Sequence, residues 1–347
     1  MDTRLPAGSL TKGSRDTAPL VGDGDIIGDI IMVRHLRKYF PVYGGLFSRL
    51  KGYIRAVEDV SFSIPRGRTL GLVGESGCGK TTTGRALLRL IEPTSGEFLF
   101  HGESVFRLPR EKLRRLRRKM QIIFQDPFSS LNPRKSVGST IGEVLKIHRL
   151  GGGKERREMT EWVISKVGLL PSDIHRYPHE FSGGGRQRIA IARAIVLRPD
   201  FIVCDEPISA LDVSIQAQII NLLKELQEEL HLSYLFIAHD LHVVRHISDE
   251  VAVMYMGRIV ERAEVKELFK GPLHPYSRAL ISAVPVPEPG KKGRRLILKG
   301  EIPSPQNPPT GCPFHTRCPE KDALCREVAP ELKEVSRGHW VSCLRVG

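Results

Sequence analysis

The sequence lacks any long hydrophobic segment. None of its 347 residues belongs to a run approaching the roughly 18 consecutive apolar residues that a membrane-spanning helix needs. Residues 1–29 also lack the continuous apolar core of a secretory signal, and they are rich in glycine, aspartate, threonine and serine. These absences predict a protein of the cytoplasmic side that does not itself cross a membrane and that begins with a flexible leader, residues 1–29.

Acidic residues are fewer than basic ones. The chain has 39 Asp and Glu against 53 Lys and Arg, which gives a formal net charge of +14. Such an excess is compatible with binding to nucleic acid, anionic lipid or a nucleotide, so it does not choose among them. A hydrophobic content of 40% excludes disorder of the whole chain. The length predicts one large domain with an appendage, or two domains.

Apolar runs alternate with helical patterns from residue 30 onward. Residues 69–73, 201–204 and 234–238 are continuous apolar runs, typical of parallel strands that are covered on both faces. Residues 84–90 and 189–197 have the apolar periodicity of helices. The alternation of strands with helices predicts an α/β fold with a largely parallel sheet.

A glycine-rich loop directly follows the strand predicted for residues 69–73. It reads Gly74-Glu75-Ser76-Gly77-Cys78-Gly79-Lys80-Thr81 and leads into a predicted helix, which is the context that a phosphate-binding loop requires. Glycines let backbone N–H groups surround the phosphates, and the helix N-terminus adds positive potential. We expect Lys80 to reach the β- and γ-phosphates and the Thr81 hydroxyl to bind Mg²⁺.

Two carboxylates follow the apolar run 201–204. Asp205 is expected to reach Mg²⁺, through a water molecule, and Glu206 to polarise and orient the water that attacks the γ-phosphate. Together with the glycine loop, these residues predict hydrolysis of a nucleoside triphosphate.

A second anion-binding segment lies just before a buried helix. Ser182, Gly183 and Gly184 place small residues at the helix N-terminus, where backbone N–H groups attract anions. One nucleotide does not need two such segments from one chain. Two chains facing each other would let this segment of each close over the γ-phosphate held by the other.

These motifs resemble the nucleotide-binding subunits of ABC transporters, whose signature is commonly LSGGQ, over roughly residues 30–264. The resemblance implies a P-loop ABC-type ATPase core: a mixed sheet with a RecA-like subdomain and a helical subdomain at about 126–195. It implies that Glu206, His239 and Gln125 are catalytic, that ATP and Mg²⁺ are the cofactors, and that Thr81 and Gln125 lie at the Mg²⁺ ion.

The same resemblance implies the residues that bind the nucleotide. Phe40 lies where the family stacks an aromatic ring on adenine, with Tyr39 as the alternative. Two positions depart from the family signature, Phe181 in place of leucine and Gly185 in place of glutamine or methionine. The implied nucleotide-binding set is Phe40, Gly74, Glu75, Ser76, Gly77, Cys78, Gly79, Lys80, Thr81, Thr82, Asp205, Ser182, Gly183, Gly184 and Asp212.

Several further stretches are similar to the ATPases of oligopeptide and dipeptide importers. They include residues 125–127, 130–134 and 177–181 and the segment Leu273-His274-Pro275-Tyr276. In that subfamily an extension follows the ATPase core, here residues 265–347. The many prolines of this stretch predict a separate small module with little regular structure. The likeness implies an ATPase that powers uptake of oligopeptides, dipeptides or a related solute from the cytoplasmic face of the inner membrane, as a peripheral subunit.

The resemblance also implies the partners. We expect a paralogous ATPase subunit in a heterodimer, or a second copy in a homodimer, two membrane permease subunits and, indirectly, an extracytoplasmic solute-binding protein. The alternative is a soluble ABC ATPase that acts on nucleic acid or ribosomes, which only the net charge favours. Such proteins typically carry two ATPase cores or long coiled coils, whereas this chain has one glycine loop, so no nucleic acid partner is expected.

Four of the six cysteines lie after residue 311, at Cys312, Cys318, Cys325 and Cys343. Disulfides are disfavoured in a reducing cytoplasm, and the close C-x₂₋₄-C pairs of structural zinc sites are absent. Four thiolates at wide spacing suit a [4Fe–4S] cluster, which some peptide-importer ATPases that this chain resembles are thought to carry. We expect the cluster, with zinc and unligated thiols as the alternatives.

Overall fold

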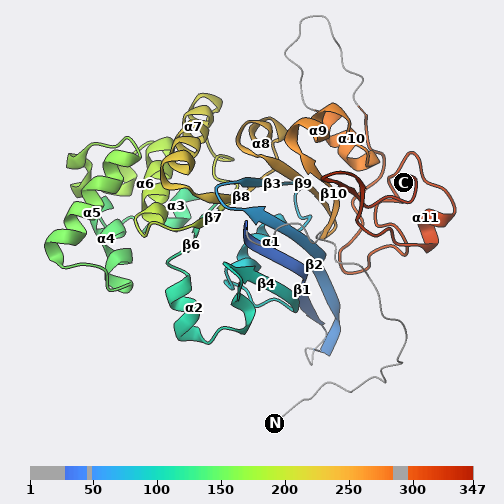
Figure 1. Ribbon diagram of the computed structural model, residues 1–347, viewed down its shortest axis with the longest axis horizontal. Helices are drawn as coiled ribbons and strands as arrows, with labels where there is room; N and C mark the ends of the chain where they lie inside the picture. The colour runs from blue at the N-terminus through green and yellow to red at the C-terminus, as the bar shows by residue number, and fades with distance from the viewer. Residues whose placement is uncertain (1–27, 45–48, 284–295, 347) are drawn as a thin grey trace, which may run out of the picture.

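The computed structural model describes residues 28–44, 49–283 and 296–346 (Figure 1). The leader expected at residues 1–29 lies outside this part of the chain, apart from its last two residues. No helix within the described ranges is both long enough and apolar enough to span a bilayer.

A mixed sheet forms the centre of the molecule, in the order β11-β12-β10-β9-β3-β8-β7-β6. The five strands from β9 to β6 are parallel, and β10, β12 and β11 join them with antiparallel pairing. The bounds are β3 (Thr69–Val73), β6 (Met120–Ile123), β7 (Phe201–Asp205), β8 (Ser233–Ala238), β9 (Glu250–Tyr255), β10 (Arg258–Glu264), β11 (Lys333–Ser336) and β12 (His339–Val341).

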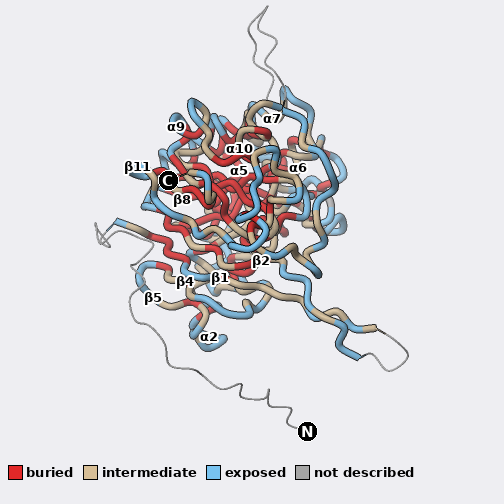
Figure 2. The backbone as a smooth tube through the Cα atoms, turned by 90° about the vertical axis from the view of Figure 1, so that its right-hand side faces the viewer, coloured by how far each residue is buried: buried red, intermediate tan, exposed pale blue. Residues whose placement is uncertain are grey.

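Alternate residues of the central strands supply two separate hydrophobic cores. In β7, Ile202 and Cys204 belong to the core shared with helices α6, α7 and α8, whereas Phe201 and Val203 belong to the core on the opposite side. This alternation follows from the pleat of a strand, which directs successive side chains to opposite faces. Burial on both faces explains why the strand is continuously apolar, and Figure 2 shows the buried backbone gathered at the centre of the molecule.

The second core lies between the central sheet and a smaller antiparallel sheet of order β2-β1-β4-β5. Helix α1 also contributes to this core through Ala86 and Leu87. The paired ends of β1 and β2 extend beyond the core as a long hairpin. The bounds are β1 (Asp29–Gly44), β2 (Arg49–Pro65), α1 (Lys80–Leu87), β4 (Ser95–Phe100), β5 (Glu103–Ser104), η1 (Val105–Arg107) and α2 (Arg110–Leu116).

A group of helices is inserted between β6 and β7 and forms one end of the molecule, on the left in Figure 1. These helices pack through α4, α5 and α6, whose buried residues include Ile141, Val163 and Ile189. The bounds are α3 (Pro127–Ser130), α4 (Val137–Ile147), α5 (Gly153–Lys166), η2 (Pro171–His175), η3 (Pro178–Glu180) and α6 (Gly183–Ile195).

The chain then returns to the central sheet and continues into the C-terminal extension. The remaining helices are α7 (Val213–Leu230), α8 (Leu241–Ile247), α9 (Val265–Lys270), α10 (Pro275–Ser282) and α11 (Leu324–Glu327). Figure 1 shows α9, α10 and α11 at the end of the molecule opposite the inserted helices.

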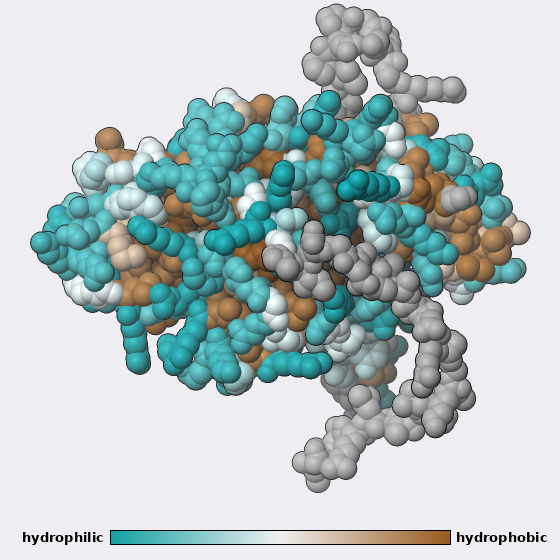
Figure 3. Space-filling view, viewed as in Figure 1, coloured by the Kyte–Doolittle hydropathy of each residue, from teal (hydrophilic) through white to brown (hydrophobic). Residues whose placement is uncertain are grey.

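The proline-rich composition of the C-terminal extension suggested a separate small module, but the extension is joined to the central sheet. Strand β12 pairs with β10 through Val341 opposite Glu261, so the extension lengthens the central sheet. Tyr276, Phe314 and Cys325 are part of the same hydrophobic core as α6 and α7. The prediction failed because partners distant in sequence bury these side chains, and composition does not report such partners. Figure 3 shows further hydrophobic side chains on the surface of this end of the molecule.

A buried carboxylate attaches the extension to the central sheet. Glu261 of β10 is completely buried, and its oxygens accept hydrogen bonds from the backbone N–H groups of Leu273 (2.7 Å) and His274 (2.9 Å). The Nε2 atom of His339 lies 2.7 Å from the same carboxylate. A buried carboxylate needs such partners, because an unpaired buried charge costs several kcal/mol (order of magnitude). Glu261 therefore ties the start of α10 and the strand β12 to one point of the sheet.

Candidate functional site

The carboxyl ends of four neighbouring parallel strands meet at one edge of the central sheet. Gly74 follows β3, Glu206 follows β7, His239 follows β8, and Gln125 lies two residues after β6. A cavity of about 490 Å³ opens at this edge and is lined by Lys80, Gln125, Glu206 and His239, together with Thr81 and Thr82. Ligands of open parallel sheets bind at such an edge, because the loops there are held by the rigid strands.

The glycine loop has a backbone that only glycine allows. Gly74 and Gly79 have φ angles of +153° and +108°, and a Cβ atom at these positions would lie 2.2 Å from the Met254 oxygen and 2.1 Å from the Ala56 oxygen. The loop folds around the side chain of Lys80, whose Nζ donates to the carbonyl oxygens of Gly74 (2.8 Å) and Glu75 (3.1 Å). A buried ammonium group at the start of α1 supplies positive charge where phosphates would bind.

Thr81 and Asp205 are brought together although 124 residues separate them. The Thr81 hydroxyl donates to Oδ1 of Asp205 at 2.7 Å, and the Nη2 atom of Arg85 lies 3.6 Å from Oδ2. Burial raises the pKa of Asp205, against the opposing effects of Thr81 and Arg85. Oδ2 is buried and has no hydrogen-bond partner. A hydroxyl and a carboxylate oxygen that lacks a hydrogen-bond partner are the oxygen donors that Mg²⁺ prefers, so these residues fit the ion.

Glu206 contacts both Gln125 and His239 in the lining of the cavity. Nε2 of Gln125 donates to Oε2 of Glu206 at 2.8 Å, and Nδ1 of His239 lies 3.5 Å from the same oxygen. The Glu206 backbone has a φ of +47°, which non-glycine residues rarely adopt, and its N–H donates to the carbonyl of Ile237 at 3.0 Å. The strained turn directs the carboxylate past the end of β7, and strain of this kind is concentrated at functional sites.

The second anion-binding segment lies at the start of α6, among the inserted helices. Ser182 is the N-cap residue, and its hydroxyl accepts a hydrogen bond from the N–H of Gly185 at 3.2 Å. Gly183 and Gly184 form the first turn of the helix, whereas Asp212 is exposed at the start of α7. None of these residues lines the cavity beside Lys80. Within one chain, the two segments therefore stay separate.

Neither aromatic residue expected to bind adenine lines the cavity. Tyr39 donates its hydroxyl to Glu58 at 2.7 Å, and burial together with this bond raises the pKa of Tyr39 to about 12. Phe40 pairs with Ile54 across the hairpin and packs against the ammonium group of Lys38. Ile54 and Ala56 line the cavity instead, and Pro305 of the extension joins them. No sequence motif marked Pro305, because its place depends on the fold of the extension.

The cysteines of the extension lie near enough to influence one another. The backbone N–H of Cys312 donates to the carbonyl of Cys325 at 2.9 Å. Burial raises the pKa of Cys312 to about 11 and also raises the pKa values of Cys318 and Cys325, with smaller contributions from the neighbouring thiols, Cys343 included. In the described ranges, however, no group of three or more His, Cys, Asp or Glu side chains is arranged to hold a metal ion.

The two remaining cysteines are buried. Burial raises the pKa of Cys78 in the glycine loop and of Cys204 in β7. Cys78 is part of the second hydrophobic core, beneath the glycine loop.

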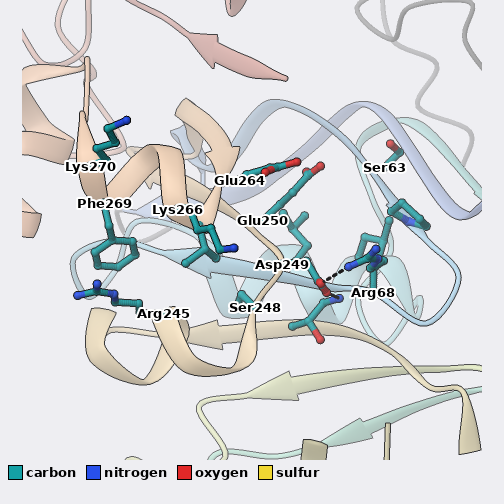
Figure 4. A pocket seen from close by; sticks show the side chains of 15 residues that line it. Ser63, Arg68, Arg245, Ser248, Asp249, Glu250, Glu264, Lys266, Phe269 and Lys270 are labelled. Atoms are coloured by element: carbon teal, nitrogen blue, oxygen red, sulfur yellow. Dashed lines mark hydrogen bonds and ion pairs between the residues drawn. The ribbon is translucent and has the colours of Figure 1, made fainter. Parts of the chain in front are cut away.

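A further cavity, of about 850 Å³, lies away from the predicted residues, at the amino end of β3 (Figure 4). Arg68 and Asp249 form an ion pair of 2.6 Å across it, and Arg245 lies over the ring of Phe269 at 5.4 Å. None of the residues predicted to bind nucleotide contributes to its lining. The predicted nucleotide-binding residues that line a cavity lie instead at the carboxyl ends of the parallel strands.

Two family models match the chain. One describes the ABC transporter family and covers residues 57–209, and the other describes the oligopeptide/dipeptide transporter C-terminal region and covers residues 260–325. The first match contains the glycine loop, the second anion-binding segment and Glu206, and the second contains Tyr276 and three of the four cysteines of the extension.

Several named proteins are similar to this chain in sequence or in structure. The chain is 55% identical to the oligopeptide transport ATP-binding protein AppF of Bacillus subtilis, over 90% of this chain and 96% of the relative. It is 49% identical to the dipeptide transport ATP-binding protein DppF of Haemophilus influenzae, over 90% and 95%. A dimeric structure of the ATP-binding cassette MJ0796 bound to ADP and phosphate superimposes with a TM-score of 0.60 at 26% identity, covering 68% of this chain and 98% of the cassette. This likeness confirms the α/β prediction.

Proposed function

Because this chain belongs to the family of ABC transporter ATP-binding proteins with an oligopeptide/dipeptide transporter C-terminal region, we propose that it powers the uptake of oligopeptides or dipeptides. The family makes the chain an ATPase subunit of an importer. The peptide substrate is supported by the names of the relatives and by the match over residues 260–325. These relatives give no support to the alternative of a nucleic acid or ribosome ATPase.

The observation that carries the ATPase chemistry is the convergence of Glu206, Gln125 and His239 on the cavity that contains Lys80. Lys80 would contact the β- and γ-phosphates, and Thr81 and Asp205 would hold Mg²⁺, which neutralises charge on the phosphates. Glu206 would accept a hydrogen bond from the attacking water and polarise it. Gln125 and His239, both beside Glu206, would orient this water and the γ-phosphate.

The separation of the two anion-binding segments supports a dimer of ATPase subunits. Ser182, Gly183 and Gly184 of one subunit would close over the nucleotide held at Lys80 of the other, with Asp212 at the same interface. We propose a paralogous subunit as the partner, with a homodimer as the alternative, bound to two permease subunits on the cytoplasmic face of the membrane. A solute-binding protein would deliver the peptide from the other side.

This proposal is tested by isolating the chain with its partners from solubilised membranes and reconstituting the complex in liposomes. We expect ATP-dependent accumulation of a labelled dipeptide or oligopeptide, and stimulation of ATP hydrolysis by the loaded solute-binding protein. Stimulation by a different class of solute, with no accumulation of any peptide, would contradict the peptide assignment while leaving the ATPase intact.

The four cysteines of the extension are proposed to bind a [4Fe–4S] cluster. Four thiols come from one compact segment, and the pKa of Cys312 responds to the other three. A bound cluster would supply four iron–thiolate bonds across the extension and require all four thiols to be deprotonated.

Iron analysis of protein purified without oxygen tests the cluster. We expect about four irons per chain and a brown colour, as the [4Fe–4S] stoichiometry requires. Cys318→Ser should lose both, and Cys204→Ala should keep them, because Cys204 is buried in β7 far from the extension in sequence. Stoichiometric zinc without iron would show that the cysteines bind zinc and not a cluster. The absence of both metals would contradict the cluster and the zinc site alike.

A further inference from the structure

Two side chains of the C-terminal extension hold Glu75, the second residue of the phosphate-binding loop. Arg317 forms a bidentate ion pair with it, Nη1 to Oε2 at 2.7 Å and Nη2 to Oε1 at 3.0 Å. The hydroxyl of Tyr276 accepts a hydrogen bond from the Glu75 backbone N–H at 2.9 Å. The extension therefore contacts both the side chain and the backbone of the loop that surrounds Lys80.

These contacts are shielded from water. The side chain of Arg317 is 7% exposed and that of Glu75 is 28% exposed, whereas Tyr276 is completely buried. The guanidinium group also lies over the ring of Tyr255, 5.9 Å from its centroid. The ion pair with Glu75 is the main cause that raises the pKa of Arg317. A bidentate pair in this environment is stronger and more directional than an exposed one.

The segment Leu273-His274-Pro275-Tyr276 has a defined place in this arrangement. His274 is the N-cap of α10 and accepts the N–H of Tyr276 through Nδ1 at 3.1 Å, while Glu261 holds the backbone of Leu273 and His274. The Tyr276 ring packs against Tyr255 and Phe314, with centroids 4.8 and 5.5 Å apart. The motif therefore fixes the Tyr276 hydroxyl at the loop.

Arg317 is fixed by the segment that carries the cysteines. It directly precedes Cys318, and its N–H donates to the carbonyl of Phe314 at 3.0 Å. The backbone of the same segment is joined to Cys325 through the N–H of Cys312. The position of the guanidinium group thus depends on the folding of the cysteine segment.

We propose that Arg317 and Tyr276 are positioning residues for the phosphate-binding loop, through which the C-terminal extension sets the affinity of the chain for MgATP. Arg317 neutralises the carboxylate of Glu75 and turns it away from the phosphates, and Tyr276 fixes the loop backbone next to it. This inference rests on the proposed nucleotide site at Lys80. Neither residue touches the reacting atoms.

The electrostatic part of this proposal has a distinctive consequence. Without Arg317, the carboxylate of Glu75 would stay unpaired beside a site for a polyanion, and like charges in a partly buried site repel strongly. The loss should therefore depend on Glu75. Removal of its charge should restore binding even when Arg317 is absent, which would not occur if Arg317 only supported the fold.

The experiment measures the dissociation constant of MgATP for the full-length chain by equilibrium titration. We expect Arg317→Ala to weaken binding about tenfold, the scale of losing one strong charge pair. The double variant Arg317→Ala/Glu75→Gln should recover most of this loss. The dissociation constant of Arg317→Lys should lie between those of the parent and of Arg317→Ala, because lysine keeps the charge and loses the bidentate geometry.

Two matched controls separate the loop from general folding. Arg345→Ala removes a half-exposed arginine of the same extension, paired to Asp322 at 3.6 Å, and should leave MgATP binding unchanged. Tyr276→Phe should weaken binding about threefold, in line with one lost neutral hydrogen bond. Tyr234→Phe also removes a buried hydroxyl, which donates to Leu223 at 3.0 Å, and should not affect binding.

The inference would be overturned if Arg317→Ala bound MgATP as tightly as the parent, or if the double variant bound no better than Arg317→Ala. Lys80→Ala, measured in the same titration, separates this failure from failure of the proposed site. Weak binding by Lys80→Ala with normal binding by Arg317→Ala would keep the nucleotide site and reject only the role of the extension.

Discussion

The phosphate-binding edge and the C-terminal extension position their side chains in different ways. At the edge, Lys80, Glu206 and His239 follow the ends of hydrogen-bonded parallel strands. In the extension, Arg317 lies in a segment without regular strands, and the buried ring of Phe314 packs this segment against Tyr255. Glu261 of β10 holds other parts of the extension, at Leu273, His274 and His339.

This difference predicts what a substitution changes in each region, activity or stability. Backbone pairing distributes the support of the edge over many hydrogen bonds, so one substitution there changes chemistry more than structure. The extension depends on a few buried polar and aromatic contacts, so one substitution can release it. We therefore expect variants of the edge to lose activity while folded, and variants of the extension to lose stability.

The largest expected effect is at Glu206. Glu206→Gln keeps the shape of the side chain and removes the charge that polarises water, so hydrolysis should fall by about a hundredfold or more while MgATP binding persists. Phosphate release from the assembled transporter measures hydrolysis, and equilibrium titration measures MgATP binding. Turnover near the parental rate would remove Glu206 from the catalytic role.

Substitutions of Lys80 and His239, at the same edge of the sheet, should have separate effects on MgATP binding and on ATP hydrolysis. Lys80→Ala removes an ammonium group aimed at the phosphates and should weaken MgATP binding by at least about tenfold. His239 is 61% exposed at the mouth of the cavity, so His239→Ala should leave binding and stability unchanged and slow hydrolysis. The His239→Ala variant should melt near the parental temperature. Equal loss of binding in the two would show that the assignment is wrong.

Glu261 offers the sharpest test of the extension. Glu261→Ala leaves the N–H groups of Leu273 and His274 and the ring of His339 without their buried acceptor, which should cost about 3 kcal/mol of unfolding free energy. Denaturant titration would measure this loss. Glu264→Ala, at the exposed end of the same strand, is the matched control and should change stability little. Equal stability of the two variants would refute the anchoring role.

The effect that is smallest at neutral pH is a pH dependence from His274. Burial, and to a smaller extent the charge of Arg278, lowers the pKa of His274 from 6.5 to about 3. The unfolded chain then binds the proton more readily, so His274 should reduce stability as pH falls from about 6.5 toward 3, by up to about 1.4 kcal/mol per pH unit. His274→Asn keeps an N-cap acceptor without a titrating ring and should flatten this slope. An unchanged slope in this variant would assign the acid sensitivity to other groups.

Much of the fold and of the phosphate-binding edge could be predicted from local sequence. The spacing of Gly74, Gly79 and Lys80 reflects constraints within one loop, and the continuous apolar run before Asp205 reflects burial of a strand on both faces. Because parallel strands place their carboxyl ends together, the residues that follow each strand could be assigned to one site. The family resemblance added Gln125 and His239, which no local pattern marked.

Other features depended on contacts that no local pattern records. Glu75 and Arg317 are 242 residues apart, and neither has a neighbour in sequence that indicates the pairing. Phe40, the aromatic expected at adenine, does not line the cavity, whereas its hairpin partner Ile54 does, because the pairing of the hairpin decides which side chains line it. Proline content suggested a separate extension, whereas the pairing of β12 with β10 joined it to the central sheet. Local sequence limits backbone conformation and burial, but the packing of distant segments selects the side chains that meet.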